Sequence, residues 1–294
     1  MTTRLAVSAL TDVGLVREMN EDAFLVADLP GEAFAPSAEV TRFEVTDHGA
    51  LIALSDGMGG HKDGAEASRL TLAALLSALA SSAPSAEASE RLKEAVEAAN
   101  LAVFNAGEGV GSHRMGATLT AVLVQGREAF LAEIGDSRAY LLRGGVIKQV
   151  THDQSMRQAL LDSGAVSPKE AAESPFRNIV LQAIGQKPAV TVALGKLELR
   201  ARDCIILCSD GLSNELTKEE IGKVILGAQS LSEASAELVE LAKRRGGHDN
   251  ITVVIAGVGG DVSPMVPGER ISSTFDILST FDGKPPSRRP PSQA

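Results

Sequence analysis

Short apolar runs alternate with glycine-containing breaks through most of the chain, and several of the runs end at an aspartate. Residues 51–54 lead into Asp56 and residues 204–208 lead into Asp210, each aspartate preceded by serine and followed by glycine. Runs this short and continuous are typical of buried strands rather than amphipathic helices. The pattern therefore predicts two buried strands that each place a carboxylate at a strand end.

Two further aspartates fit the same plan. Asp136 lies in a turn between two apolar runs, which predicts a hairpin, and Asp249 precedes the run at residues 251–258. Two carboxylates 4 Å apart repel by about 4 kcal/mol at an effective dielectric near 20, so a cluster persists only if protonated or neutralised by cations. Oxygen ligands favour Mg²⁺ or Mn²⁺. The alternative is that each aspartate caps its own surface turn.

The remaining pattern predicts a mixture of strands and helices. Strands are expected at residues 4–10 and 22–29, and several more between 116 and 150, where glycines separate apolar runs. Ala and Leu recur at helical spacing over residues 65–80, and a second helix is expected to follow Pro84-Ser85 and run to about Ala106-Gly107. Thr217 and Ser230 each begin a capping-box sequence, which predicts two later helices. Residues 30–50 are expected to form a loop or short hairpin, and residues 153–185 a helical insertion over the site.

Beyond Val258 the pattern changes into a segment rich in Pro, Ser and Arg. This composition cannot bury enough apolar surface to fold by itself. We therefore expect a folded domain over residues 1–258 and a disordered tail, partly polyproline II, over residues 259–294.

The charge and the cysteine and histidine content of the chain argue against several classes of protein. Hydrophobic residues make up 44% of the 294 positions, which is ample for a core, and the net charge of −10 argues against nucleic acid or an anionic membrane as a partner. Cys204 and Cys208 lie too far apart along one predicted strand to form a disulfide, so we expect core residues in a reducing compartment. The five histidines lack paired spacing for zinc. No membrane span or signal segment is recognised at the N-terminus, so we expect a soluble, cytoplasmic protein. We also expect a monomer.

Six motifs in order resemble the metal-dependent Ser/Thr protein phosphatases of type 2C, the PPM family. The resemblance covers roughly residues 4–258, and Met58 after Asp-Gly makes the bacterial members the most similar. It implies an α+β fold, a four-layer α-β-β-α sandwich of two mainly antiparallel sheets flanked by helix pairs, and makes residues 1–258 the catalytic domain. The motifs are Arg17 to Asp22, Asp56 to Ser68, Met115 to Thr118, Gly135 to Tyr140, Ser209 to Leu212 and Gly247 to Thr252.

The resemblance assigns metal ligands at the strand ends. By the family pattern Asp56 is catalytic and bridges two Mn²⁺ or Mg²⁺ ions, and the carbonyl of Gly57 binds the first ion. Asp210 and Asp249 would hold the second ion.

It also assigns four residues around these ligands. Glu21 and Asp22 would act through metal-bound waters, and Asp136 matches the position of a third, weaker ion shared with Asp210. Arg17 matches the arginine that binds the phosphate of the substrate and is implied as catalytic.

Three positions depart from the family pattern. Met58 stands where animal members have a histidine that can act as a general acid, Gln154 where many bacterial members have histidine, and Ala117 where threonine is frequent. The residue that protonates the leaving group is therefore unassigned, while every metal-binding acid is present.

The reaction that this resemblance implies is hydrolysis of phosphoserine and phosphothreonine in proteins, opposing bacterial Ser/Thr kinases. The nucleophile would be a metal-bound hydroxide attacking in line. Two alternatives remain open: a binding module that recognises a phosphorylated partner or nucleotide without turning it over, and a phosphohydrolase of small phosphate esters.

Overall fold

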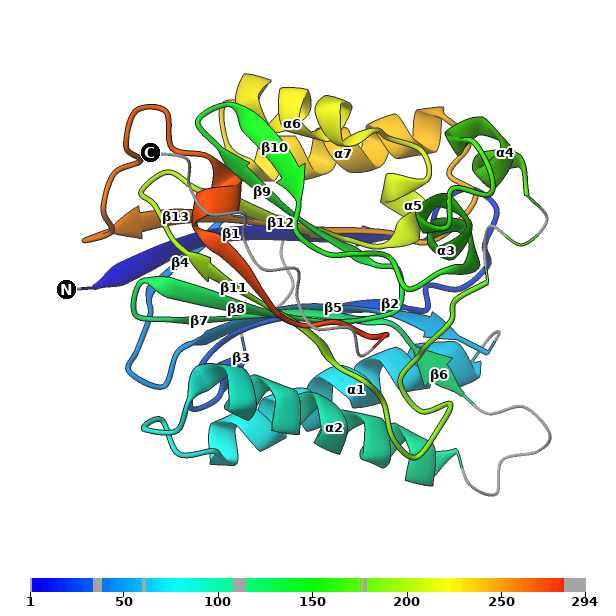
Figure 1. The fold of residues 1–294 in the computed structure, drawn as a ribbon, viewed down its shortest axis with the longest axis horizontal. Helices are drawn as coiled ribbons and strands as arrows, with labels where there is room; N and C mark the ends of the chain where they lie inside the picture. Colours follow the sequence, from blue (N-terminus) through cyan, green and yellow to red (C-terminus); the bar gives the residue numbers. More distant parts are fainter. Residues whose placement is uncertain are drawn as a thin grey trace.

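Two β-sheets pack face to face, and a pair of helices covers the outer face of each (Figure 1). In this computed structural model, residues 2–33, 39–59, 62–107, 115–174, 176 and 179–282 are described. Helices α1 (Lys62–Ser81) and α2 (Ala88–Ala106) cover one sheet, and α6 (Lys218–Gly227) and α7 (Leu231–Arg244) cover the other. The predicted four-layer α-β-β-α sandwich is confirmed.

All strand neighbours in both sheets are antiparallel among the described residues. The six-stranded sheet has the order β10 (Val146–Gln149), β9 (Arg138–Arg143), β12 (Cys204–Cys208), β13 (Ile251–Gly260), β1 (Thr3–Asp12), β4 (Thr41–Glu44). The eight-stranded sheet has the order β14 (Phe275–Ser279), β11 (Ala193–Glu198), β8 (Glu128–Ile134), β7 (Leu119–Gln125), β5 (Ala50–Met58), β2 (Asp22–Asp28), β3 (Glu32–Ala33), with β6 (Gly116–Ala117) paired to β5.

The central strands are apolar throughout because each is covered on both faces. Successive side chains of a strand point to opposite faces. In β5, Leu51 and Ala53 pack in the cluster shared with α1 and α2, whereas Ile52 and Leu54 pack in the cluster between the sheets. β12 is buried in the same way, between the sheets on one face and under α6 and α7 on the other. This double burial explains why both runs lack polar alternation.

Most predicted elements are present within a few residues of their expected bounds. The insertion at residues 153–185 contains α3 (Met156–Asp162) and α4 (Pro168–Glu173), at the same end of the sandwich as α5 (Asp210–Ser213) (Figure 1). Both late helices begin where capping sequences predicted. Thr217 and Glu220 form the reciprocal box, whereas the carboxylate of Glu233 accepts from the amide of Gln229 instead of that of Ser230.

The predicted hairpin at Asp136 is wrong. The strands on either side of this turn, β8 and β9, belong to different sheets, so the turn carries the chain across the sandwich. Sequence patterns of two adjacent buried strands do not reveal whether they pair with each other, because both strands are apolar on both faces.

The prediction of a disordered tail is wrong for residues 259–282. β13 continues to Gly260, Ile271 is buried in the short helix η1 (Ile271–Ser273), and β14 pairs with β11 at the sheet edge. The rest of the predicted tail, residues 283–294, lies outside the described residues.

A buried ion-pair network attaches this C-terminal segment to the sandwich. Arg143 in β9 is 3% exposed and donates to both carboxylate oxygens of Asp203, at 2.7 and 2.6 Å, and to Thr274 Oγ1 at 2.6 Å. Arg200 is paired with Glu269 at 2.8 Å. A buried guanidinium is costly unless its donors are satisfied. The polar composition beyond Val258 therefore supplies partners for buried arginines, which a count of apolar residues does not detect.

Replacing Thr274 by valine should destabilise the whole protein, because Arg143 loses a charge-assisted hydrogen bond with little change in side-chain volume. We expect the free energy of unfolding to fall by about 1.5–3 kcal/mol. Urea titration of the variant beside Ser272→Ala, an exposed neighbour, measures the effect. Equal stability of the two variants would mean that the hydrogen bond from Arg143 to Thr274 does not stabilise the fold.

Among the described residues, no helix has the length and apolarity needed to cross a bilayer. Cys204 and Cys208 are free and buried in β12, and burial raises the pKa of both thiols to about 12. They are core residues, as predicted.

Candidate active site

Antiparallel pairing gathers the predicted acids at one end of the sandwich. Asp22 opens β2 and lies directly opposite Asp56, near the end of β5. Asp210 follows β12, and Asp249 precedes β13, its antiparallel neighbour. Because the end of one antiparallel strand lies beside the start of the next, each sheet contributes one pair of carboxylates.

Asp22 connects the two pairs across the interface between the sheets. Its Oδ2 accepts hydrogen bonds from Ser209 Oγ at 2.7 Å and Thr252 Oγ1 at 2.6 Å, both from the opposite sheet. Its Oδ1 is buried and has no hydrogen-bond partner among the described residues. Burial raises the pKa of Asp22, and this effect outweighs the two hydrogen bonds, which lower the pKa. Repulsion by Asp210 and Asp249 raises it further.

The carboxyl group of Asp56 lies where the other acids converge. Its pKa is raised well above the ordinary value, first by burial and then by repulsion from Asp22, Asp210, Asp136 and Asp249. Its backbone is fixed by Thr118, which accepts from the Asp56 amide through Oγ1 at 2.9 Å and donates its own amide to the Asp56 carbonyl at 2.8 Å. The predicted cluster of carboxylates is therefore present.

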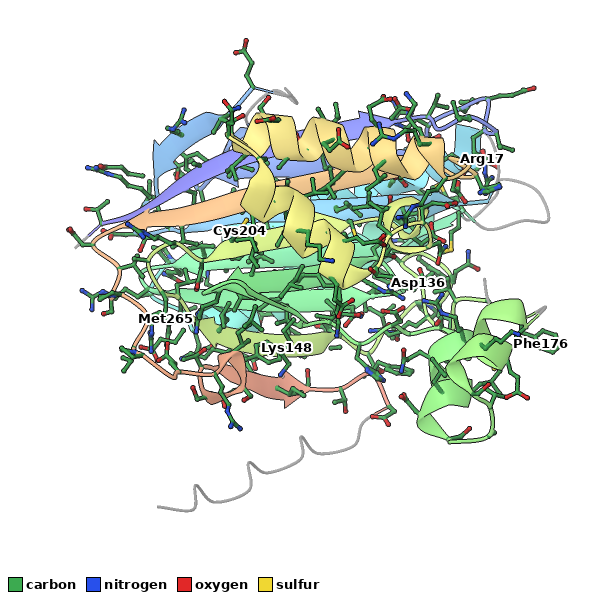
Figure 2. The ribbon with its side chains drawn as sticks, turned by 90° about the horizontal axis from the view of Figure 1, so that it is seen from above. Arg17, Asp136, Lys148, Phe176, Cys204 and Met265 are labelled. Carbon is green, nitrogen blue, oxygen red and sulfur yellow. The ribbon has the colours of Figure 1, made fainter. Side chains whose placement is uncertain are left out.

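Asp136 joins the cluster from the turn between the sheets. It lines one recess with Asp210 and with Asp153, Ser155 and Arg157, which belong to the insertion that contains α3 and α4; we refer to this insertion as the flap. Burial raises the pKa of Asp136 to about 7, and repulsion by Asp210 and Asp153 acts in the same direction. Figure 2 shows Asp136 at the same end of the molecule as Arg17, far from Cys204 and Met265.

Arg17 reaches the cluster from the loop between β1 and β2. Its Nη2 is 2.8 Å from Asp249 Oδ2. The loop is held by Asn250, whose side-chain amide donates to the carbonyls of Val13 and Met19 and whose Oδ1 accepts from the amide of Glu21 at 2.8 Å. One asparagine beside Asp249 thus fixes the loop that presents both Arg17 and Glu21.

Two glycines allow the backbone to approach Glu21 closely. The amide of Gly57 donates to the Glu21 carbonyl at 3.2 Å, and a Cβ added to Gly57 would collide with the carbonyl of Gly64. A Cβ on Gly64 would collide with the carboxylate of Glu21. The Asp-Gly sequence at the end of β5 is thus required by packing as well as by any role of its carbonyl.

The donor set fits a hard divalent cation by its chemistry. All candidate ligands are oxygens, the buried Asp22 Oδ1 is without a protein donor in the described structure, and the acids raise one another's pKa values. As they stand, however, no three described His, Cys, Asp or Glu side chains form a group that could hold an ion. Arg17 and Asn214 donate to Asp249 and Asp210, and an ion would compete with them.

Several supporting residues were not predicted, because they are small polar groups at the ends of apolar strands or in the turns beside them. Ser209 and Thr252 hold Asp22, and Ser137 Oγ lies 2.8 Å from Thr118 Oγ1 behind Asp56. The signal in the sequence was a hydroxyl residue at or beside the end of a buried apolar run. Gln154, at a position that departs from the family pattern, is buried; its amide donates to the Glu133 carbonyl at 2.9 Å and fastens the flap to β8.

The sequence model described as protein phosphatase 2C matches residues 36–246. The chain is 37% identical over 285 residues, or 95% of its length, to the serine/threonine protein phosphatase PstP of Mycobacterium tuberculosis, of which it covers 50%. It is 32% identical to the serine/threonine phosphatase stp of Listeria welshimeri, with 83% of this chain and 92% of that protein covered.

A solved structure shares the fold at similar identity. The catalytic domain of PstP in complex with two manganese ions matches with a TM-score of 0.73 and 37% identity, over 88% of this chain and 100% of that one. The chain spans about half the length of the first curated relatives that it matches.

Proposed function

Because the chain belongs to the protein phosphatase 2C family, we propose that it hydrolyses phosphoserine and phosphothreonine in proteins, opposing Ser/Thr kinases. The observation that carries this proposal is the convergence of Asp22, Asp56, Asp136, Asp210 and Asp249 at one end of the sandwich. A binding module that only recognises phosphate would need cations there, and repulsive carboxylates serve it poorly.

The cofactor proposed is a pair of Mn²⁺ or Mg²⁺ ions, and the manganese complex of PstP supports it. Asp56, the carbonyl of Gly57, Asp210 and Asp249 would hold them, and Asp136 with Asp210 a third. Bound divalent ions supply Lewis acidity toward phosphoryl oxygens and lower the pKa of a bound water.

Two further acids act around these ligands. Glu21 and Asp22 would act through water. Asp22 is fixed by Ser209 and Thr252, so its Oδ1, which has no partner within the described ranges, has a defined direction.

The role proposed for Arg17 is to bind the phosphoryl group. Its guanidinium is half-exposed and lies on Asp249, so it can turn between the carboxylate and an arriving phosphate. A planar guanidinium pairs with two phosphate oxygens at once. The neighbouring Asn250 positions the loop, so Arg17 is presented without a large loss of entropy.

The reaction is tested by phosphate release from a phosphothreonine peptide, with manganese and with chelator. Release from the peptide that exceeds release from p-nitrophenyl phosphate supports a protein phosphatase, and the reverse order supports an enzyme of small esters. Binding of the peptide without release would support the recognition module.

Arg17→Ala should lower kcat/KM for the phosphopeptide by about 10- to 100-fold, with a higher KM and a lower kcat, because charge-assisted hydrogen bonds to the phosphoryl group are lost. Steady-state kinetics beside Arg4→Ala, an exposed arginine paired with Glu44 at the sheet edge, provide the comparison. Parental kinetics in Arg17→Ala would remove this residue from the site.

A further inference from the structure

A second recess opens beside the acid cluster, and we refer to it as the basic pocket. Its volume is about 280 Å³, and its lining comes from β9, β10, the flap helix α3 and the segment from α5 to α6. Arg138, Arg157 and Lys218 contribute cations to it, and Ser213, Asn214 and Glu215 lie between them. At about 30 Å³ for each water, the pocket has room for a phosphate group and several waters.

The basic pocket is continuous with the proposed reaction site. The smaller recess that contains Asp136 and Asp210 is lined by Arg138, Arg157, Ser213 and Asn214, which also line the basic pocket. Asn214 joins the two directly, since its Nδ2 donates to Asp210 Oδ2 at 3.1 Å and its Oδ1 lies 3.4 Å from Arg157 Nη1. A group bound in the pocket would therefore lie next to a phosphate held at the acids.

The cations of the pocket differ in how far other side chains satisfy them. Asp153 accepts hydrogen bonds from Arg138 Nε at 2.9 Å and from Arg138 Nη2 at 2.5 Å. The guanidinium of Arg138 is therefore already paired and is not available to a ligand. Arg157 has only distant contacts among the described residues, 3.5 Å to Asp153 and 3.4 Å to Asn214. Lys218 lies 3.8 Å from Glu219, with both side chains exposed. Two cations thus remain available for a ligand.

The anions of the pocket are compensated by other groups. Glu215 accepts from His248 at 2.8 Å, and Asp153 is saturated by Arg138 and Gln149. The Ser213 hydroxyl is buried and has no hydrogen-bond partner in the described part of the chain. The pocket therefore offers two cations that are held only by long ion pairs, and a hydroxyl that has no partner among the described residues. Together these groups suit an anion with several acceptor oxygens.

We propose that the basic pocket binds a second phosphate of the same phosphoprotein substrate, so that doubly phosphorylated segments are preferred. This inference rests on the proposed function. A phosphate monoester carries nearly two negative charges and three acceptor oxygens, which match Arg157, Lys218 and Ser213 better than a single carboxylate does.

The experiment compares peptides that share one phosphothreonine and carry, within four residues on either side, a phosphoserine, a glutamate or a serine. For the parent in saturating Mn²⁺, we expect kcat/KM to be about fivefold higher for the best doubly phosphorylated peptide, with a smaller gain for glutamate. Each of Arg157→Gln and Lys218→Gln should reduce this preference. Lys148→Gln, which removes an exposed lysine of β10 outside the pocket, should retain it.

Two variants protect the test against misfolding: Arg157 is bonded to Asp153 and Asn214, whereas the ion pair given for Lys218 in the described structure is with Glu219. Equal kcat/KM for all peptides in the parent would overturn the pocket assignment while leaving the phosphatase proposal intact. Absence of release from every peptide would overturn the phosphatase proposal instead. Inorganic phosphate distinguishes a free ion from a substrate group: activation of the singly phosphorylated peptide by free phosphate would show an effector site and contradict a substrate site.

Discussion

Asp56→Asn is expected to abolish phosphate release and, at the same time, to make the metal-free protein more stable. The asparagine keeps the shape of the side chain but cannot carry the charge that burial and Asp22, Asp210 and Asp136 oppose. In chelator near pH 7 the variant should melt higher than the parent, by about 2–4 °C for each kcal/mol of repulsion relieved. Function and stability thus change in opposite directions at this position.

Added Mn²⁺ should stabilise the parent more than the Asp56→Asn variant. In the parent, Mn²⁺ should raise the melting temperature because it binds the folded state. At a free Mn²⁺ concentration of 100 times the dissociation constant, the folded state gains about 2.7 kcal/mol of stability. The variant should lose most of this stabilisation, because a ligand of the proposed ions is removed. Its kcat should fall by about 10³-fold or more, since these ions would stabilise the charge of the transition state.

Melting curves of both proteins in chelator and in millimolar Mn²⁺, with activity alongside, measure all three effects. Asp47→Asn is the matched control, since Asp47 is exposed in the turn before the same strand. If Asp56→Asn melts below the parent in chelator and still gains the parental increment from Mn²⁺, the acid cluster does not bind metal.

The stability of the metal-free protein should fall as the pH rises from about 5 to 8. Asp136 has its pKa raised from the ordinary 3.8 to about 7, and the pKa values of Asp22 and Asp210 are raised too. The folded state then binds more protons than the unfolded state between these pH values, so deprotonation favours unfolding, by about 1.4 kcal/mol per pKa unit for each group. The stabilisation is complete below pH 4 and is lost through pH 7.

Saturating Mn²⁺ should give the opposite slope, because the ion binds the deprotonated carboxylates. Urea titrations at pH 5, 6, 7 and 8, with chelator or Mn²⁺, measure both slopes. The buried Glu133 has its pKa raised as well, so Asp136→Asn is needed to isolate one site acid. A slope in chelator that is flat in the parent, or unchanged in Asp136→Asn, would contradict this account of the cluster.

Local sequence patterns identified the acids but not all of their partners. Asp56 and Asp210 were visible because a continuous apolar run before each one indicates burial on two faces, a property of the strand itself. Ser209, Thr252 and Asn250 were not predicted to hold Asp22 or the Arg17 loop, because their contacts join residues about 190 to 240 positions apart. No local pattern contains such a pairing.

The two errors have the same physical origin. The turn at Asp136 looks like a hairpin because its flanking strands are both buried, yet their hydrogen-bond partners lie in separate sheets. The segment after Val258 looks unable to fold because it is polar, yet Thr274 and Glu269 satisfy arginines that the domain has already buried. In both cases the deciding interaction is supplied by a distant part of the chain.

The sequence by itself determined which strands are buried, where the two late helices begin, and which carboxylates stand at strand ends. These features follow from the apolar periodicity and capping of neighbouring residues. Only the tertiary structure decided that antiparallel order brings Asp22, Asp56, Asp210 and Asp249 to one end, that Asp22 is held across two sheets, and that a basic pocket adjoins them. The reason is that strand pairing depends on how much apolar surface both sheets bury together. No single segment of the chain contains that information.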